Sequence, residues 1–305
     1  MGDKILPSTP GVPESGISST DFGPRFSKPA AFFWLLRLNR TVMVAIITGA
    51  GAFAAGAGVG ASFWMTLAGW CLAVGGFSLD FYADRDLDTR GPRAEVRHNP
   101  LADGSLPPSA GLAFSLTFLA VSFVITLLIT PWALIPWGVV LAIVVGLALH
   151  RFETPLARAF TLGLLQALYL LMGGAAGQLS PGLGLLAGMF FFAMFGGRGM
   201  IDIRDFSQDE HTRVQTLPKR YGTKRTARFT AVCLLISCAL SLAAYFTGEF
   251  SAVYLYLDIV FIAVTLSGAW LFAMRPTPRM AYILTIVYMM GAGIIICLAI
   301  ILGSV

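Results

Sequence analysis

Nine long apolar stretches, separated by short polar segments, dominate this sequence. Each has about 18 to 25 residues, the length that a helix needs to cross the hydrocarbon core of a bilayer. The chain of 305 residues is 56% hydrophobic and only 12% charged, which is far too apolar for a soluble domain. We therefore expect an all-α polytopic membrane protein with nine transmembrane helices. The predicted spans are 31–56, 62–82, 109–129, 133–150, 159–179, 183–201, 227–247, 252–273 and 281–302.

The basic residues are distributed unequally between the two sides that these spans define. All 21 Lys and Arg residues fall in the segments on one side or at the adjoining helix ends. The opposite loops, near 57–61, 130–132, 180–182 and 248–251, carry none, and of the acids only Glu249 and Asp258 fall on that side. Loops rich in Lys and Arg stay in the cytoplasm. The pattern predicts a cytoplasmic N-terminus and an external C-terminus, in a bacterial or archaeal cytoplasmic membrane.

The first residues differ in composition from the rest. Residues 1–28 are rich in Pro, Gly and Ser and contain no apolar run of signal-peptide length. We interpret them as a flexible cytoplasmic tail, followed by a single nine-helix domain over 29–305. The four cysteines lie inside apolar stretches without CxxC spacing, which favours neither a disulfide framework nor a zinc site.

Two aspartate-rich segments follow the second and sixth spans, both on the predicted cytoplasmic side. Within each segment the acids are three or four residues apart, so that each row shares one face of a helix. A row of like charges is unfavourable unless a cation binds there. Oxygen ligands without His or Cys favour Mg²⁺, which often keeps positions open for phosphate oxygens. The predicted metal ligands and catalytic residues are Asp80, Asp84 and Asp88 in the first row, and Asp202, Asp205 and Asp209 in the second.

Basic residues surround both rows, and guanidinium groups bind phosphate oxygens directly. Carboxylates for a metal together with arginines for phosphate suit a diphosphate leaving group. Arg97 in the first loop and Arg198, Arg204 and Lys219 around the second are the candidates. For the basic run from Lys219 to Arg228, a topology signal that faces lipid headgroups is an equal alternative.

The two segments resemble the signatures of the UbiA superfamily of intramembrane prenyltransferases. The first signature is typically Asn-x3-Asp-x3-Asp with an Arg-Pro-Leu-x-x-Gly-like element after it, and the second is Lys-Asp-x-x-Asp-x3-Asp followed by Thr-Leu-Pro and a Gly. Here the first row begins with Asp80 and is followed by Asn99-Pro100-Leu101-Ala102-Asp103-Gly104. The second row is followed by Thr216-Leu217-Pro218 and Gly222.

Three departures from the family pattern stand out. Asp80 replaces the usual Asn and adds a negative charge to the first row. Ile201 stands where the family has Lys, so Arg198 or Arg204 would have to supply that phosphate contact. The segment that begins at His150 lacks the Tyr-Ser start of quinone-type relatives, which weakens the assignment of an acceptor.

The resemblance implies nine helices around a central cavity that opens near the cytoplasmic side. It also implies Mg²⁺-dependent transfer of a prenyl group from a (poly)prenyl diphosphate to an aromatic, quinone-precursor-like or other lipid acceptor within the membrane. Arg158 resembles a basic family position near the diphosphate. The residues that we expect to line the cavity, where aromatic faces could stabilise an allylic cation, are Asn39, Arg40, Tyr82 and Tyr169.

Other functions are compatible with part of this pattern. A terpene cyclase of the same superfamily would use the same site without an acceptor. A phosphatidyltransferase would need an Asp-Gly-x-x-Ala-Arg element before Asp80, which the sequence lacks. An ion-coupled transporter would carry its acids near the bilayer midplane rather than at helix ends. The expected partners are a prenyl diphosphate, a hydrophobic or aromatic acceptor and the lipid bilayer, with no nucleic acid and an unassigned oligomeric state.

Overall fold

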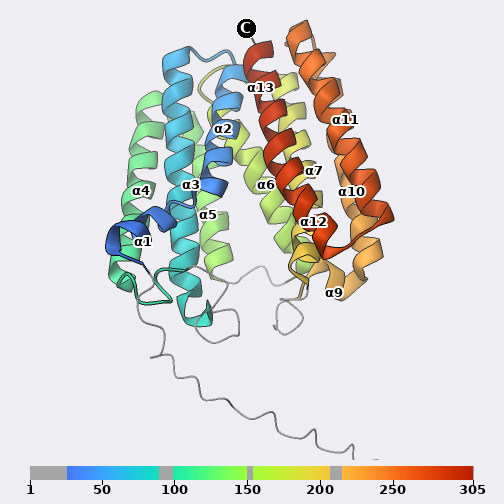
Figure 1. Cartoon of the computed structure of the whole chain (residues 1–305). Helices are drawn as coiled ribbons and strands as arrows, with labels where there is room; N and C mark the ends of the chain where they lie inside the picture. Colours follow the sequence, from blue (N-terminus) through green and yellow to red (C-terminus); the bar gives the residue numbers. More distant parts are fainter. Residues whose placement is uncertain (1–25, 89–98, 150–153, 207–214, 305) are drawn as a thin grey trace, which may run out of the picture.

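The computed structural model describes residues 26–88, 99–149, 154–206 and 215–304, and over these ranges the chain forms helices and no strands (Figure 1). The elements run roughly along one axis and form a single bundle. Their bounds are α1 Lys28–Leu35, α2 Leu38–Ala54, α3 Val59–Asp88, α4 Pro108–Ile129, η2 Pro131–Ala133, α5 Leu134–Ala148, α6 Pro155–Gly174, α7 Pro181–Arg204, α9 Leu217–Tyr221, α10 Thr223–Tyr245, α11 Ala252–Met274, α12 Pro278–Leu284, η3 Thr285–Ala292 and α13 Gly293–Gly303.

The structure confirms an all-helical membrane architecture. Eight segments of the described chain are long and apolar enough to cross a bilayer, and the bent pair α1–α2 makes a ninth if it is counted as one span. Several spans start with proline at the first helical turn, where its missing N–H does no harm. Pro108, Pro155 and Pro181 begin α4, α6 and α7 in this way.

The first and last spans are less regular than the sequence predicted. Instead of one helix over 31–56, α1 and α2 meet at an angle of 40°. At this break Arg37 adopts a left-handed backbone conformation, with φ 46° and ψ 47°. The last span contains a π-helical segment, Thr285–Ala292, between two α-helical parts. Such segments interrupt the regular hydrogen-bond ladder and alter the direction of a helix.

Glycines allow α2 and α6 to approach until their backbones touch. A Cβ atom on Gly173 would lie 1.8 Å from the carbonyl oxygen of Thr48, and one on Gly51 would lie 2.0 Å from that of Leu170. Small residues at such positions are the usual means by which membrane helices pack closely. The fifth span, α6, is thus held directly against α2 of the first span.

Buried hydroxyl groups join each aspartate-bearing helix to the next span. Ser115 of α4 donates to the carbonyl of Gly75 in α3 at 2.7 Å. Thr230 of α10 donates to the carbonyl of Gly196 in α7 at 2.9 Å. In an apolar environment these bonds satisfy hydroxyls that would otherwise be unpaired. The two helices that carry the predicted site are therefore fixed by equivalent contacts in the two halves of the chain.

The end of the bundle opposite the aspartates contains a partly buried acid with a structural role. Glu249 accepts hydrogen bonds from the hydroxyl of Ser180 and, at 3.1 Å, from the backbone N–H of Gly182. Both donors lie at the N-terminus of α7, where a negative charge is favourable. These hydrogen bonds give a structural role to Glu249, one of the two acids on the side that lacks basic residues.

Candidate active site

The first aspartate row lies on the last turns of α3, as the spacing predicted. With 30 residues, α3 is about 45 Å long and exceeds the ~30 Å hydrocarbon core, so one end projects beyond it. Asp80 and Asp84 lie four residues apart on this end, and the side chain of Asp80 is 45% exposed. Asp88 is the last residue of α3, and its side chain lies outside the described part of the structure.

Arg37 reaches the first row from the break between α1 and α2. Its guanidinium lies 3.7 Å from the carboxylate of Asp80 and 4.0 Å from the ring centroid of Phe81. Phe77 lies one turn earlier, with its ring centroid 5.4 Å from the same group. Nothing in the local sequence pattern predicts a left-handed residue inside an apolar span, so Arg37 is a site residue that the sequence does not indicate.

The segment after the first loop folds back onto α3. Asn99 donates from its side-chain amide to the carbonyl of Phe81 at 3.0 Å and accepts from the N–H of Leu101 at 3.0 Å. Asn99 is 1% exposed. Leu101 and Leu106 complete a small apolar cluster with Phe81 and with α1. This motif therefore fixes the end of α3 instead of standing free in the loop.

The second row lies at the end of α7. α7 ends at Arg204, and Asp205 is its C-cap, whose N–H donates to the carbonyl of Ile201 at 3.0 Å. Arg204 and Asp205 form two parallel contacts of 2.8 Å with each other. Asp209 lies outside the described residues.

Among the described acids of the two rows, Asp202 is the most enclosed, with 2% of its side chain exposed. One oxygen lies 2.7 Å from the Nε of Arg198, one turn earlier on α7. The other accepts a hydrogen bond from the N–H of Leu217 at 3.0 Å. The Thr216-Leu217-Pro218 motif therefore folds back onto its aspartate helix, as the Asn99 motif does onto α3.

The remaining predicted residues occupy several elements. Arg158 lies one turn inside α6 and is half-buried, and Lys219 lies on α9. Asn39 and Arg40 are exposed at the start of α2. Arg97 lies outside the described residues.

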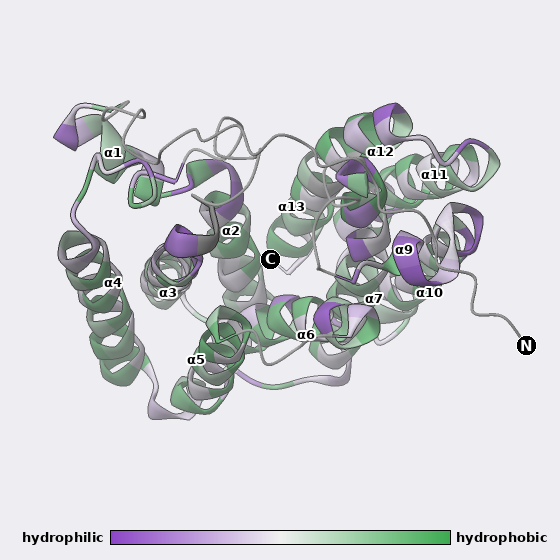
Figure 2. Cartoon of the chain, turned by 90° about the horizontal axis from the view of Figure 1, so that it is seen from below, coloured by the Kyte–Doolittle hydropathy of each residue, from purple (hydrophilic) through white to green (hydrophobic). Residues whose placement is uncertain are grey.

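The two tyrosines proposed for the cavity have different surroundings. Tyr169 is buried in α6 at 5% exposure. Tyr82 lies on α3, with the guanidinium of Arg85 4.4 Å from its ring centroid. These contacts give Tyr82 a cation partner at the membrane end that carries the aspartates. That end is visible in Figure 2, where hydrophilic residues gather on α2, α3, α9 and α10.

The acids of this end suit a magnesium ion that is bound in part by a substrate. All donors in the two rows are carboxylate oxygens, which Mg²⁺ prefers. Within the described ranges, no three His, Cys, Asp or Glu side chains converge closely enough to hold a metal by themselves. Mg²⁺ is commonly bound by one or two carboxylates together with phosphate oxygens and water. The described residues fit that mode of binding.

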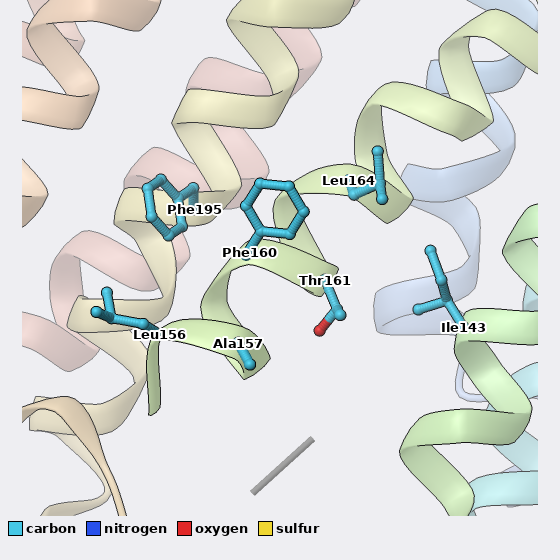
Figure 3. A pocket seen from close by; sticks show the side chains of 7 residues that line it. All are labelled: Ile143, Leu156, Ala157, Phe160, Thr161, Leu164 and Phe195. Carbon is cyan, nitrogen blue, oxygen red and sulfur yellow. The ribbon is translucent and has the colours of Figure 1, made fainter. Parts of the chain in front are cut away.

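An apolar pocket of about 530 Å³ lies between α5, α6 and α7 (Figure 3). Leu156 and Phe160 on its rim are 42% and 49% exposed, so the pocket opens toward the side of the bundle. Thr161 supplies a hydroxyl to the lining, and that hydroxyl donates to the carbonyl of Arg158 at 3.0 Å. A prenyl chain is of this apolar character. The lining consists of Ile143, Leu156, Ala157, Phe160, Thr161, Leu164 and Phe195.

Comparison with protein families identifies one model that spans most of the chain. The model describes the UbiA prenyltransferase family and matches residues 42–302. The digeranylgeranylglyceryl phosphate synthase of Methanosphaera stadtmanae is 28% identical over 196 residues, which are 61% of this chain and 69% of that protein. The protoheme IX farnesyltransferase of Desulforudis audaxviator is 25% identical over 299 residues, 93% of each chain.

Solved structures share the fold. A structure of digeranylgeranylglyceryl phosphate synthase superposes with a TM-score of 0.74, at 21% identity, and covers 91% of this chain and 98% of its own. A UbiA homologue from Archaeoglobus fulgidus, bound to DMAPP and Mg²⁺, superposes with a TM-score of 0.70 at 18% identity. It covers 87% of this chain and 95% of its own.

Proposed function

Because this chain belongs to the UbiA prenyltransferase family, we propose that it transfers a prenyl group from a prenyl diphosphate to a lipid acceptor at the cytoplasmic face of the membrane. One observation carries the proposal. Each aspartate-bearing helix end is held by a motif that folds back onto it, through Asn99 on α3 and through Leu217 on α7. Carboxylates and arginines are thereby fixed at the same end of the fold.

The reaction needs a site that binds a diphosphate and separates it from an allylic carbon. We propose that carboxylates of the two rows hold magnesium, which when bound neutralises negative charge on the leaving diphosphate. Arg158 and Arg198 supply hydrogen bonds to phosphate oxygens. The apolar helices exclude water, which would otherwise capture the allylic cation before the acceptor does.

The apolar pocket between α5, α6 and α7 supports a place for the prenyl chain. It lies next to the start of α6, the helix that carries Arg158. A chain with its diphosphate near Arg158 could extend along the apolar lining toward the lipid. The pocket's lack of charged side chains suits an isoprenoid and not a polar acceptor.

Two acceptor classes follow from the relatives and from the sequence. The relatives are named for products built on glyceryl phosphate and on heme, whereas the family resemblance implied an aromatic, quinone-precursor-like or other lipid acceptor. The abundance of arginine at the cytoplasmic end supports an acceptor that carries its own phosphate or carboxylate. We propose an anionic lipid acceptor of this kind.

Purified protein in lipid nanodiscs tests this function directly. Labelled prenyl diphosphates of several chain lengths are supplied with Mg²⁺ and with one acceptor at a time: a glyceryl phosphate lipid, an aromatic carboxylic acid or heme. We expect diphosphate release that depends on both Mg²⁺ and an anionic acceptor, with a prenylated lipid as product. Conversion of the prenyl diphosphate to a hydrocarbon without any acceptor would instead identify a cyclase, and no conversion with any combination would refute the proposal.

A further inference from the structure

Arg37 occupies an unusual position for a basic residue at the edge of a membrane span. Among the described residues it is the only non-glycine residue with a positive φ, at 46°. Side chains other than glycine avoid this region because Cβ approaches the backbone. Strained residues of this kind are concentrated at functional sites, where the surrounding structure enforces them.

The strained conformation coincides with the 40° break between α1 and α2. The α1 side of the break is anchored to α3. Leu35 of α1 is buried in the same apolar cluster as Phe81 and Leu101, and the hydroxyl of Ser78 donates to the carbonyl of Leu35 at 3.2 Å. These contacts tie the break to α3 beside the first aspartate row.

Of the arginine–aspartate contacts among the described residues of the site, the one between Arg37 and Asp80 is the longest. It measures 3.7 Å, whereas Arg198 lies 2.7 Å from Asp202. Strong charge-assisted contacts of this type measure about 2.7 to 2.9 Å. The guanidinium carbon of Arg37 lies over the face of the Phe81 ring, 4.0 Å from the ring centroid. This cation–π contact holds the guanidinium in place independently of Asp80. Asp80 can therefore orient the guanidinium of Arg37, and an anion that binds this guanidinium more tightly can still replace the carboxylate as its partner.

We infer that Asp80 is a positioning residue for Arg37, and that Arg37 contacts the diphosphate of the substrate. This inference rests on the proposed function and assigns Asp80 a role other than metal ligation. It also accounts for the departure at position 80. The additional negative charge of Asp80, relative to the family's Asn, has a cationic partner in Arg37.

The test separates positioning from metal binding by measuring three quantities. These are kcat, the KM for prenyl diphosphate and the Mg²⁺ concentration at half-maximal rate, for the wild type, R37Q, D80N and the double variant. R37Q should raise the KM about tenfold, the loss expected for one hydrogen bond to a charged group. D80N should raise the KM less, leave the Mg²⁺ requirement unchanged, and add nothing when R37Q is already present.

A metal ligand would behave in the opposite way. If D80N raises the Mg²⁺ requirement equally with and without R37Q, Asp80 binds metal and the inference is overturned. R85Q is the matched control, because Arg85 lies on the same helix end and contacts Asp86 at 3.5 Å. R85Q should leave the KM for prenyl diphosphate unchanged. If R85Q raises this KM as much as R37Q does, the effect is a general one of charge and the inference is refuted.

A binding measurement keeps the inference distinct from the proposed function. Inorganic diphosphate with Mg²⁺ should raise the thermal unfolding midpoint of the wild type and of R85Q, and raise that of R37Q much less. This result would support Arg37 as an anion contact even if no prenyl transfer is found. R37K, which keeps the charge but not the fork of donors, should restore part of the shift. An equal shift in all variants would exclude the contact.

Discussion

The carboxylate of Asp202 accepts a hydrogen bond from the backbone N–H of Leu217 at 3.0 Å, while its other oxygen lies 2.7 Å from Arg198. One acid of the second row thus joins the end of α7 to the short helix α9. The corresponding acid of the first row, Asp80, contacts Arg37 from another helix. The rows therefore contain acids that organise the site as well as acids that we propose to bind a metal.

Loss of Asp202 should affect both stability and activity. D202A leaves the guanidinium of Arg198 and the N–H of Leu217 without their partner in a site that is 2% exposed. Breaking a buried ion pair in this way costs about 3 kcal/mol. We expect a lower unfolding midpoint in detergent together with loss of activity. D202N, which keeps an oxygen for Leu217, should lose less stability, and equal midpoints for the wild type and D202A would contradict the assigned contacts.

Loss of the Asp84 carboxylate, unlike loss of Asp202, should affect activity without affecting stability. Asp84 lies on the projecting end of α3 and is only partly buried, so D84N should abolish Mg²⁺-dependent diphosphate release without lowering the unfolding midpoint. D86N is the matched control, because Asp86 is two residues away on the same helix but outside the row's face, with 67% of its side chain exposed. Full turnover in D84N would refute its role as a metal ligand.

Asn99 should contribute mainly to stability. N99A removes the donor to the carbonyl of Phe81 and the acceptor for the N–H of Leu101, both in a buried position. Leaving such groups unpaired costs about 1–3 kcal/mol. We expect a reduced unfolding midpoint and a parallel loss of activity. T117A removes an exposed hydroxyl that bonds only its own helix, and it should leave the midpoint unchanged. A similar loss in both variants would contradict this explanation.

The close approach of α2 and α6 makes Gly173 sensitive to the smallest addition. In G173A the new Cβ would lie 1.8 Å from the carbonyl oxygen of Thr48, so the two backbones must separate. We expect a loss of about 1–3 kcal/mol from overpacking, seen as a lower unfolding midpoint. G184A, where no atom lies within 4 Å of the added Cβ, should be neutral or slightly stabilising. A neutral G173A would show that the helices are not in backbone contact.

The buried carboxyl group of Asp258 should destabilise the folded protein. This residue is fully buried in α11, and within the described part of the chain neither carboxylate oxygen has a hydrogen-bond partner. An unpaired buried carboxyl is unfavourable, especially within a membrane. D258N keeps the shape but removes the acid, and we expect the unfolding midpoint to rise, by an amount equivalent to about 1 kcal/mol. A marked fall would reveal that the carboxyl has a stabilising partner.

Much of the fold could be predicted because hydrophobic length and charge are local properties. The spans and the position of the aspartates after the second and sixth spans agree closely with the structure. The helical face of the first row is correct for Asp80 and Asp84, since α3 continues to Asp88. For the second row, α7 ends at Arg204 and Asp209 lies outside the described residues, so the shared face of these acids stays a prediction; spacing alone does not mark where a helix ends.

The amino-acid sequence by itself determined the membrane class, the number of apolar spans and the end of the bundle that carries the charges. Each of these follows from composition within one segment and from the cost of placing charge in lipid. Only the tertiary structure decided that Arg37 meets Asp80, and that Asn99 and Leu217 fold back onto the helices before them. These contacts depend on how helices rotate and where they break, which many weak interactions between distant residues settle together.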